Sequence, residues 1–549
     1  MKVKKVLSLA LSFVLALSVL AGCGSKKTEA KLVVNLVSEP EKLNTLLATD
    51  APAGDVNRHI MTNLVMLDEH DNVIPGDKPG AGVAESWEIS EDGLTYVFKL
   101  REGMKWTNGD PVTAHDFEYA WKALLNPETG AKYAYFAYVL KNGQAYNSGE
   151  DGVTADDVGV KATDDYTLEV VLESPTAYAL SSFSFPSFTP VNQKFFEKVG
   201  LDTYMSSTDE ETFCTNGPYT MDTWKHGDEI VLKKNKDYYA ANQMAFIEEI
   251  NFKMIGDANT WMNSYRAGEL DVTTINGEQK DILSAEGLKL NTFMDGASAY
   301  LQFNFERDGV KNQKIRKAIA LAVDNDEFVK AVQKNDSVPA TSFTPPGVQG
   351  LEKPFYEEVG ELIPIHANPE EAKKLFAEGL KEENMTAEDF VKKVTLIGDD
   401  SSKALVSLSV VQEQIRKNLG IEIQVESMPF KSRIAAMHEG EFSIAFALWG
   451  PDYNDPNTFL DMFETGGGNN QGKFSNATYD EKLNQARIEP DLAKRMQLLI
   501  DLEKIVCEEV VVAPIYWRSV DYIVSERVEG VRRTMLQNFN LLFAKIADK

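Results

Sequence analysis

An aspartate stands where a buried strand is expected to end, and its neighbours suit it to bind a cation. Residues 442–448 form a short, almost wholly apolar run that is typical of a buried strand. The Trp-Gly-Pro sequence at 449–451 then ends the strand, because proline has no N–H to donate to a ladder. Asp452 and Tyr453 follow directly. The Asp452 carboxylate could accept an ammonium group in a hydrogen bond worth about 1.5–3 kcal/mol, or it could only cap the next turn.

Other sequences that could do chemistry are incomplete. Residues 467–473 spell the start of a phosphate-binding loop, but Phe474 stands where magnesium binding needs serine or threonine. His438 lacks the second histidine of a zinc helix, and Pro456 occupies the third ligand position of a calcium loop that would begin at Asp452. No G-x-S-x-G or S-x-x-K sequence occurs, and no carboxylate pair stands out among the 84 acids. We therefore expect no catalytic residue, no metal site and no cofactor.

The elements around Asp452 predict a parallel sheet. Strands joined by helical crossovers form such sheets, and ligands bind beyond the carboxyl ends of their strands. Asp452 would therefore lie at the binding edge of a doubly wound sheet. The predicted strands are 394–397, 421–425 and 442–448, and the predicted helices between them are 403–419 and 431–439.

The first half of the chain has its own pattern of short elements. A strand is predicted at 31–37 and a hairpin at 82–101, followed by a helix with a capping box at its start and a further strand. The stretch 67–189 therefore reads as a compact α+β unit with an aromatic core. Residues 247–275 follow a β-α-β pattern, which indicates a parallel pair of strands.

Composition limits the class of protein. The chain has 549 residues, enough for several domains, and its hydrophobic share of 43% is ordinary for a folded protein. The net charge of −28 argues against nucleic acid or an anionic membrane surface as a partner, since phosphate binding needs clustered Lys and Arg. Some residues are expected in the core and not at a binding site. They are Trp106, Trp121, Trp224 and Trp261, with Cys214 and Cys507 as free, mostly buried thiols, although a bridge between these cysteines is left open.

The N-terminus predicts export. Three lysines within the first five residues precede an apolar run at 6–20, which is too short to be a permanent membrane span. The Leu-Ala-Gly-Cys sequence that ends at Cys23 looks like a bacterial lipobox, which implies cleavage before Cys23 and lipid attached to its sulfur. We therefore expect a signal peptide at 1–22 and a lipidated linker at 23–30. A plain secretory signal is the alternative.

A long motif resembles that of a known family. Residues 82–117, GVAESWEISEDGLTYVFKLREGMKWTNGDPVTAHDF, closely resemble the signature of family 5 solute-binding proteins, the oligopeptide-binding lipoproteins of peptide ABC importers. The resemblance covers essentially the whole mature chain, although L-N-T at 43–45 stands where many members have L-D-P. Further matching stretches are 215–219 (TNGPY), 267–271 (AGELD), 300–304 (YLQFN) and 450–456 (GPDYNDP).

The resemblance implies an α/β, two-lobed fold of the periplasmic-binding-protein type II-like kind (cluster C), with an extra α+β domain inserted in lobe one. A ligand would be enclosed between the lobes by a hinge motion. The implied domains are domain I at 31–66, 190–297 and 518–549, domain II (the insert) at 67–189, and domain III at 298–517.

The resemblance also implies a ligand and a site. Asp452 would bind the α-ammonium of an extended oligopeptide, which is held mainly through its backbone. The residue that meets the peptide carboxylate is left open among Arg433, His366 and Lys473. The other residues expected beside the ligand are Trp449, Gly450, Tyr453, Asn454, Asn304 and Tyr133.

The expected role is capture of oligopeptides for an ABC importer permease, without catalysis. The protein would be a monomer with a palmitate-type lipid anchor on the extracytoplasmic face of a bacterial membrane, as on a Gram-positive outer surface. The alternatives are a same-fold receptor for another solute (dipeptide, metal complex or glycoside), a peptide-signal receptor without transport, and a secreted hydrolase.

Overall fold

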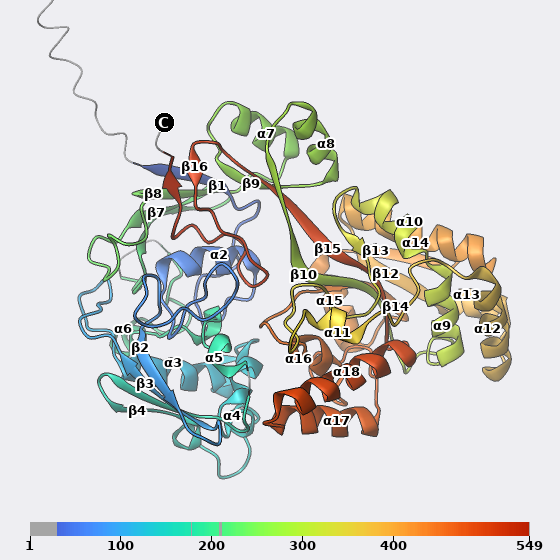
Figure 1. Ribbon diagram of the computed structural model, residues 1–549, viewed down its shortest axis with the longest axis horizontal. Helices are drawn as coiled ribbons and strands as arrows, with labels where there is room; N and C mark the ends of the chain where they lie inside the picture. The colour runs from blue at the N-terminus through green and yellow to red at the C-terminus, as the bar shows by residue number, and fades with distance from the viewer. Residues whose placement is uncertain (1–29, 177, 208–210, 548–549) are drawn as a thin grey trace, which may run out of the picture.

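The computed structural model describes residues 30–176, 178–207 and 211–547, so the predicted signal peptide and Cys23 lie outside the described residues. The chain forms two bodies joined by two long strands (Figure 1). We call the described residues up to 289 and from 525 lobe one, and residues 304–511 lobe two. The joining strands are β10 (Leu290–Phe303) and β15 (Val512–Val524), which pair antiparallel with each other.

One sheet continues through both lobes. It has eleven strands in the order β13-β12-β14-β10-β15-β9-β1-β8-β7-β6, with β11 (Val338–Pro339) paired to β15. Strands β10 and β15 therefore stand at its centre, where the sheet passes from one lobe into the other. Because only these two strands carry the sheet across, they are the natural hinge for a rotation of one lobe against the other.

Lobe one contains one half of the large sheet and the inserted α+β unit. The prediction of a β-α-β unit at 247–275 is refined, because β8 and β9 do not pair with each other: both pair parallel with β1, which lies between them. The insert is an antiparallel sheet of four strands, β2-β3-β5-β4, and its helix α3 begins at the predicted capping box. The elements are β1 (Lys31–Asn35), α2 (Ala51–Ile60), β2 (Ala84–Ile89), β3 (Thr95–Leu100), α3 (Ala114–Leu125), α4 (Gly143–Asn147), β4 (Val160–Asp164), β5 (Thr167–Val171), α5 (Ala179–Ser182), α6 (Gln193–Val199), β6 (Tyr219–Lys225), β7 (Glu229–Lys234), β8 (Glu249–Lys253), α7 (Ala258–Arg266), β9 (Val272–Ile275), α8 (Gly277–Ala285), β16 (Val528–Glu529) and β17 (Lys545–Ile546).

Lobe two contains the parallel strands that the sequence predicted. Strand β12 (Thr395–Asp399) pairs parallel with β13 (Gln424–Met428) on one side and with β14 (Ile444–Trp449) on the other. The predicted strand at 421–425 is wrong by three residues, because the buried Ile421 and Ile423 pack into the core before pairing with β12 begins at Gln424. The helices are α9 (Gln313–Ala322), α10 (Asn325–Phe328), α11 (Phe355–Val359), α12 (Pro369–Glu382), α13 (Ala387–Lys393), α14 (Ser402–Leu419), α15 (Phe430–Glu439), α16 (Asn457–Leu460), α17 (Ala477–Ile488) and α18 (Leu492–Glu508).

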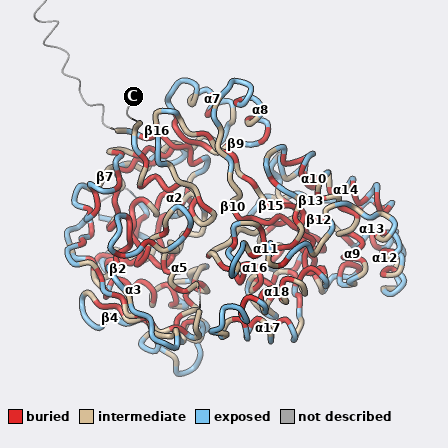
Figure 2. Tube along the Cα trace, in the orientation of Figure 1, coloured by how far each residue is buried: buried red, intermediate tan, exposed pale blue. Residues whose placement is uncertain are grey.

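Each lobe has its own hydrophobic core, seen as separate red interiors in Figure 2. In the insert, the Trp121 ring lies 5.0 Å from that of Phe183 and its indole N–H donates to the Phe188 carbonyl. Burial of the predicted core residues is confirmed for Trp106, Trp121 and Trp261, and Cys214 and Cys507 are free, buried thiols. Trp224 is only half-buried, because its indole N–H reaches out to the Glu39 carboxylate. No helix within the described residues has the length and apolarity of a membrane span.

Candidate ligand-binding site

The turn after β14 holds Asp452 in a fixed place. Strand β14 lies between β12 and β10, with Trp449 opposite Ser298. Beyond it, the Trp449 indole N–H donates to the Thr458 carbonyl over 2.9 Å, and the Asp452 backbone N–H donates to the Thr458 hydroxyl over 3.0 Å. Because these two bonds tie the turn to α16, the Asp452 side chain is presented by a rigid element of lobe two.

Asp452 lines a cavity at the junction of the lobes. The cavity has a volume of about 320 Å³, and the lobe-one residues that line it include Asp50, Arg58, Tyr133 and Phe185. Small-molecule sites typically have volumes of about 300–1,000 Å³. Within the part of the chain that the structure describes, no donor or cation bonds the Asp452 carboxylate. A half-buried carboxylate without a partner has lost part of its hydration at a cost, so this wall of the cavity is suited to a cationic group.

Burial and a second carboxylate set the electrostatics of the site. Burial, with the Asp461 carboxylate nearby, raises the pKa of Asp452 to about 7. Burial likewise raises the pKa of Asp461 to about 7, against the opposing effects of Arg487 and the Tyr453 hydroxyl. Burial and the charges of Asp452 and Asp50 raise the pKa of Tyr133 to about 12. Burial is the main cause of all three shifts, and neighbouring carboxylates add to those of Asp452 and Tyr133, so a bound ammonium would stabilise the ionised form of Asp452.

Tyr133 lies in the wall of the same cavity as Asp452. Its hydroxyl donates to the Thr49 carbonyl over 3.2 Å. Its ring is packed edge-on against Phe136 and Phe185, at centroid distances of 5.3 and 5.5 Å. These contacts fix the ring, so lobe one offers the cavity a rigid aromatic wall.

Other predicted neighbours are not in the cavity wall. Asn304 lies away from the cavity: it is buried at the opposite end of β14, where its amide donates to the Gly440 carbonyl and accepts from the Glu306 backbone N–H. The Asn454 amide oxygen accepts from the Gln349 backbone N–H within lobe two. Trp449, Gly450 and Tyr453 flank Asp452 without being among the residues that line the cavity.

The three residues considered for the peptide carboxylate also lie elsewhere. Arg433 is buried and donates to the Asp399 carboxylate over 2.6 Å, so its charge is already compensated. His366 and Lys473 are exposed and do not line the cavity. The cation that does line it is Arg58 of α2, which sequence reasoning missed.

Arg58 carries no direct ion pair within the described residues. One terminal nitrogen donates to the Leu536 carbonyl over 3.4 Å, and its Nε is buried without a partner. Nothing in the spacing of α2 marks Arg58 as different from a solvated arginine, because its position at the cavity depends on how the two lobes meet.

One group of metal-type ligands occurs within the described residues. Ligand atoms of Asp324, Asp326 and His366 lie within 4.8 Å of one another. Asp324 caps α10 by accepting from the Glu327 backbone N–H, and Asp326 pairs with Lys330 at 2.7 Å. Since such capping and pairing explain these side chains fully, the cluster is an ordinary acidic surface feature.

Two lobes meet around a cavity and are joined by two hinge strands. The Asp452 carboxylate faces this cavity without a partner among the residues that the structure describes, so the fold and site define a two-lobed binding protein for small solutes. The chain belongs to the bacterial extracellular solute-binding proteins of family 5, whose model matches residues 78–471. These are extracytoplasmic substrate-binding proteins of ABC importers, and the predicted family and two-lobed α/β fold are confirmed.

Individual relatives agree over nearly the whole chain. The dipeptide-binding protein DppE of Bacillus subtilis (strain 168) is 34% identical over 524 residues, which cover 95% of this chain and 92% of that protein. Listeria monocytogenes OppA bound to peptide has a TM-score of 0.81 at 30% identity, covering 95% of this chain and 100% of that one.

The arrangement of the lobes resembles that of a peptide-bound relative more than that of an open one. The unliganded open form of the murein tripeptide-binding protein MppA has a TM-score of 0.70 and covers 94% of this chain and 98% of that one. The Escherichia coli MppA structure has a TM-score of 0.79 and covers 95% and 99%, and both are 25% identical to this chain. A rotation of one lobe lowers such a score without changing either lobe. The TM-score of 0.81 with the peptide-bound Listeria monocytogenes OppA, against 0.70 with the open form, therefore places the lobes here closer to the peptide-bound arrangement.

Proposed function

We propose that this protein captures short peptides by their free amino terminus and delivers them to the permease of an ABC importer. The observation that carries the proposal is the half-buried Asp452 carboxylate, which faces the cavity between the lobes without a partner among the described residues. A peptide α-amino group has a pKa of about 7.7–8.0, so it is cationic at neutral pH. Relatives named as dipeptide- and oligopeptide-binding proteins support peptide as the ligand.

The proposed site has two walls of different character. Asp452 receives the ammonium from lobe two, and Tyr133 and Phe185 cover the first residues of the peptide from lobe one. Trp449, Gly450 and Asn454 act indirectly, by holding the turn that carries Asp452. The residue boundaries of the three domains, given above from the family resemblance, are part of this proposal.

The test uses two peptides that differ only at the amino terminus. Free tri-alanine is expected to raise the melting temperature of the protein, whereas N-acetyl-tri-alanine, which has no ammonium group, leaves it unchanged. Equal shifts with both peptides would remove Asp452 from its role. Sequencing of ligands released from gently purified protein separates peptide from the alternatives, a metal complex or a glycoside.

We further propose that the protein is not an enzyme and acts as a monomer held at the membrane by lipid on Cys23. Loss of the lipid in Cys23→Ser should release the protein into the medium. Metabolic labelling with palmitate should mark the natural chain and not this variant. Recovery of the intact peptide after long incubation supports binding without hydrolysis, and appearance of cleavage products would revive the hydrolase alternative.

A further inference from the structure

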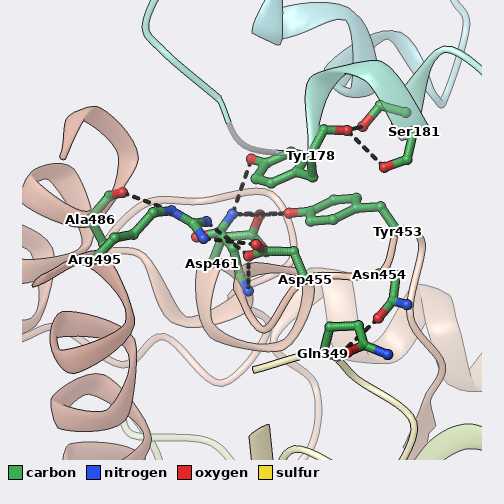
Figure 3. A network of polar contacts seen from close by, with 11 residues as sticks. Tyr178, Ser181, Gln349, Tyr453, Asn454, Asp455, Asp461, Ala486 and Arg495 are labelled. Carbon is green, nitrogen blue, oxygen red and sulfur yellow. Dashed lines mark hydrogen bonds and ion pairs between the residues drawn. The ribbon is translucent and has the colours of Figure 1, made fainter. Parts of the chain in front are cut away.

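We infer that Tyr178 of lobe one is a positioning residue that latches the closed cleft by stacking on Tyr453, the neighbour of Asp452. The inference rests on the proposed function and names a part of the site that lies outside the ligand cavity. We call Tyr178, Tyr453 and Asn457 the interlobe latch. Figure 3 shows Tyr178 lying over Tyr453, with the polar groups of lobe two beneath them.

The latch has close contacts of two kinds. The rings of Tyr178 and Tyr453 are stacked at a centroid distance of 4.0 Å and an interplanar angle of 9°. The Asn457 amide nitrogen lies 3.2 Å from the Tyr178 hydroxyl and 2.9 Å from the Tyr453 hydroxyl. One side chain of lobe two therefore bonds both rings, and the stack is fixed in register as well as in distance.

Burial shows that these contacts depend on closure. Tyr453 belongs to lobe two by sequence, but its ring is only 8% exposed and packs into the hydrophobic cluster of lobe one. In Figure 1, α5 and α16 face each other across the junction of the lobes, away from the hinge strands. Opening the cleft would separate the two rings and expose both to water, which costs free energy in proportion to the apolar area.

The lobe-two half of the latch is built in advance. Asp455 accepts two hydrogen bonds from the Arg495 guanidinium, at 2.7 and 2.8 Å, and both side chains are about nine-tenths buried. The same carboxylate accepts from the Asn457 backbone N–H over 2.9 Å. The Tyr453 hydroxyl donates to Asp461 over 3.1 Å. Because this network lies within lobe two, it persists when the cleft opens and is already formed when Tyr178 stacks on Tyr453.

The lobe-one half is a short, braced segment. The Tyr178 carbonyl accepts hydrogen bonds from the hydroxyls of Ser181 and Ser182, at 2.9 and 3.0 Å, at the start of α5 (Figure 3 shows the bond from Ser181). These bonds fix the backbone that carries the Tyr178 ring. Closure therefore brings two ordered surfaces together, and little side-chain freedom is lost when the rings meet.

The latch is connected to the ligand site through the chain itself. Tyr453 follows Asp452 directly, and Asp461, which accepts from Tyr453 and Asn457, is also the carboxylate whose charge acts on Asp452. A peptide between Asp452 of lobe two and Tyr133 of lobe one favours the closed state, which is also the state in which Tyr178 stacks on Tyr453. Peptide and latch therefore favour the same state of the lobes, and each strengthens the other.

Two variants separate the stack from the hydroxyl. Tyr178→Phe keeps the ring, and Tyr178→Leu keeps an apolar side chain without it. The measurements are the dissociation rate of free tri-alanine by stopped flow and the radius of gyration of the unliganded protein by small-angle scattering. We expect Tyr178→Leu to dissociate about 2- to 10-fold faster, the range of an aromatic pair, with little change in association rate and a larger radius of gyration. We expect Tyr178→Phe to stay within about 2-fold of the natural protein.

The outcomes are distinguishable. Unchanged dissociation and unchanged radius of gyration in Tyr178→Leu would overturn the latch. Failure of the natural protein itself to bind tri-alanine would refute the proposed function instead. Denaturant unfolding of each variant reports on folding, because a latch at the lobe junction should leave the free energy of unfolding of each lobe unchanged.

Discussion

Replacing Asp452 with asparagine removes the charge at the site and keeps its shape. If the carboxylate receives the peptide ammonium, the variant loses a charge-assisted hydrogen bond worth about 1.5–3 kcal/mol, which is a roughly 10- to 150-fold loss of affinity. The free energy of unfolding of the protein without peptide should rise in this variant or stay constant. Burial raises the pKa of Asp452 to about 7, so the empty cleft at pH 7.5 holds a carboxylate that is ionised at a cost. Asp452→Asn removes this cost.

The assay is isothermal titration of free and N-acetylated tri-alanine into the natural protein, Asp452→Asn and a control, Asp50→Asn. Asp50 lines the same cavity and caps α2, and asparagine is an equally good cap. The control therefore removes a charge from the cavity and keeps the cap, and it loses only the exposed hydrogen bond that Asp50 accepts from the Glu41 backbone N–H. We expect the loss to be confined to the free peptide and to Asp452→Asn, with a change of less than about 3-fold in Asp50→Asn. Equal affinity of the natural protein and Asp452→Asn for free peptide would refute the reasoning.

Three further results are expected. First, peptide affinity should fall when the pH is lowered from 7.5 to 5, because burial raises the pKa of Asp452 and Asp461 to about 7 and only the ionised carboxylate binds the ammonium. The stability that the neutral carboxyls give the empty protein is fully present below their usual pKa of 3.8 and is lost as the pH rises through 7. Titration of peptide at both pH values checks this, and equal affinities would contradict it. Second, Arg495→Met leaves the buried Asp455 carboxylate without its ion-pair partner and should lower the free energy of unfolding by about 3–5 kcal/mol, as measured by urea denaturation. The double variant that also replaces Asp455 with leucine should recover much of this loss. Third, Gly296→Ala should weaken peptide binding. Gly296 has φ +70°, and a Cβ there would lie 2.4 Å from Met535 of lobe one and 3.1 Å from Pro451 of lobe two. An unchanged dissociation constant for peptide would show that this hinge contact is not needed for closure.

Strands β12 and β14 of lobe two could be predicted from sequence because each is a mainly apolar run beside a predicted helix, whereas β13 is a polar stretch and was placed three residues too early. The hinge strands could not be predicted. The pattern of β10 is interrupted by Asp295 and Gly296, and β15 carries the charged Arg518. In the fold, Arg518 donates to Asp295 over 2.8 Å and Gly296 lies in an irregularity of the pairing. The opposite charges of Asp295 and Arg518 compensate each other across the two paired strands, but the residues lie 223 positions apart. In the sequence alone, the charges at these positions and the glycine beside Asp295 are therefore typical of a loop.

The candidate site divides in the same way. Asp452 could be found from local signals, a carboxylate just past a strand end, and the family motif supplied its expected role. Asn304 lies away from the cavity that Asp452 lines, because a motif in β10 does not indicate which end of the strand lies near that cavity. Arg58 and Tyr178 were missed because each acquires its role only when the lobes meet, and no local pattern records that contact.

The most direct test of the account is a crystal structure of the protein with a bound tripeptide. The account predicts the peptide amino nitrogen about 2.7–2.9 Å from the Asp452 carboxylate, the usual length of a charge-assisted hydrogen bond, with the lobes closed over the cavity. A peptide bound with its amino terminus elsewhere, or Asp452 turned to bulk solvent in that complex, would contradict it.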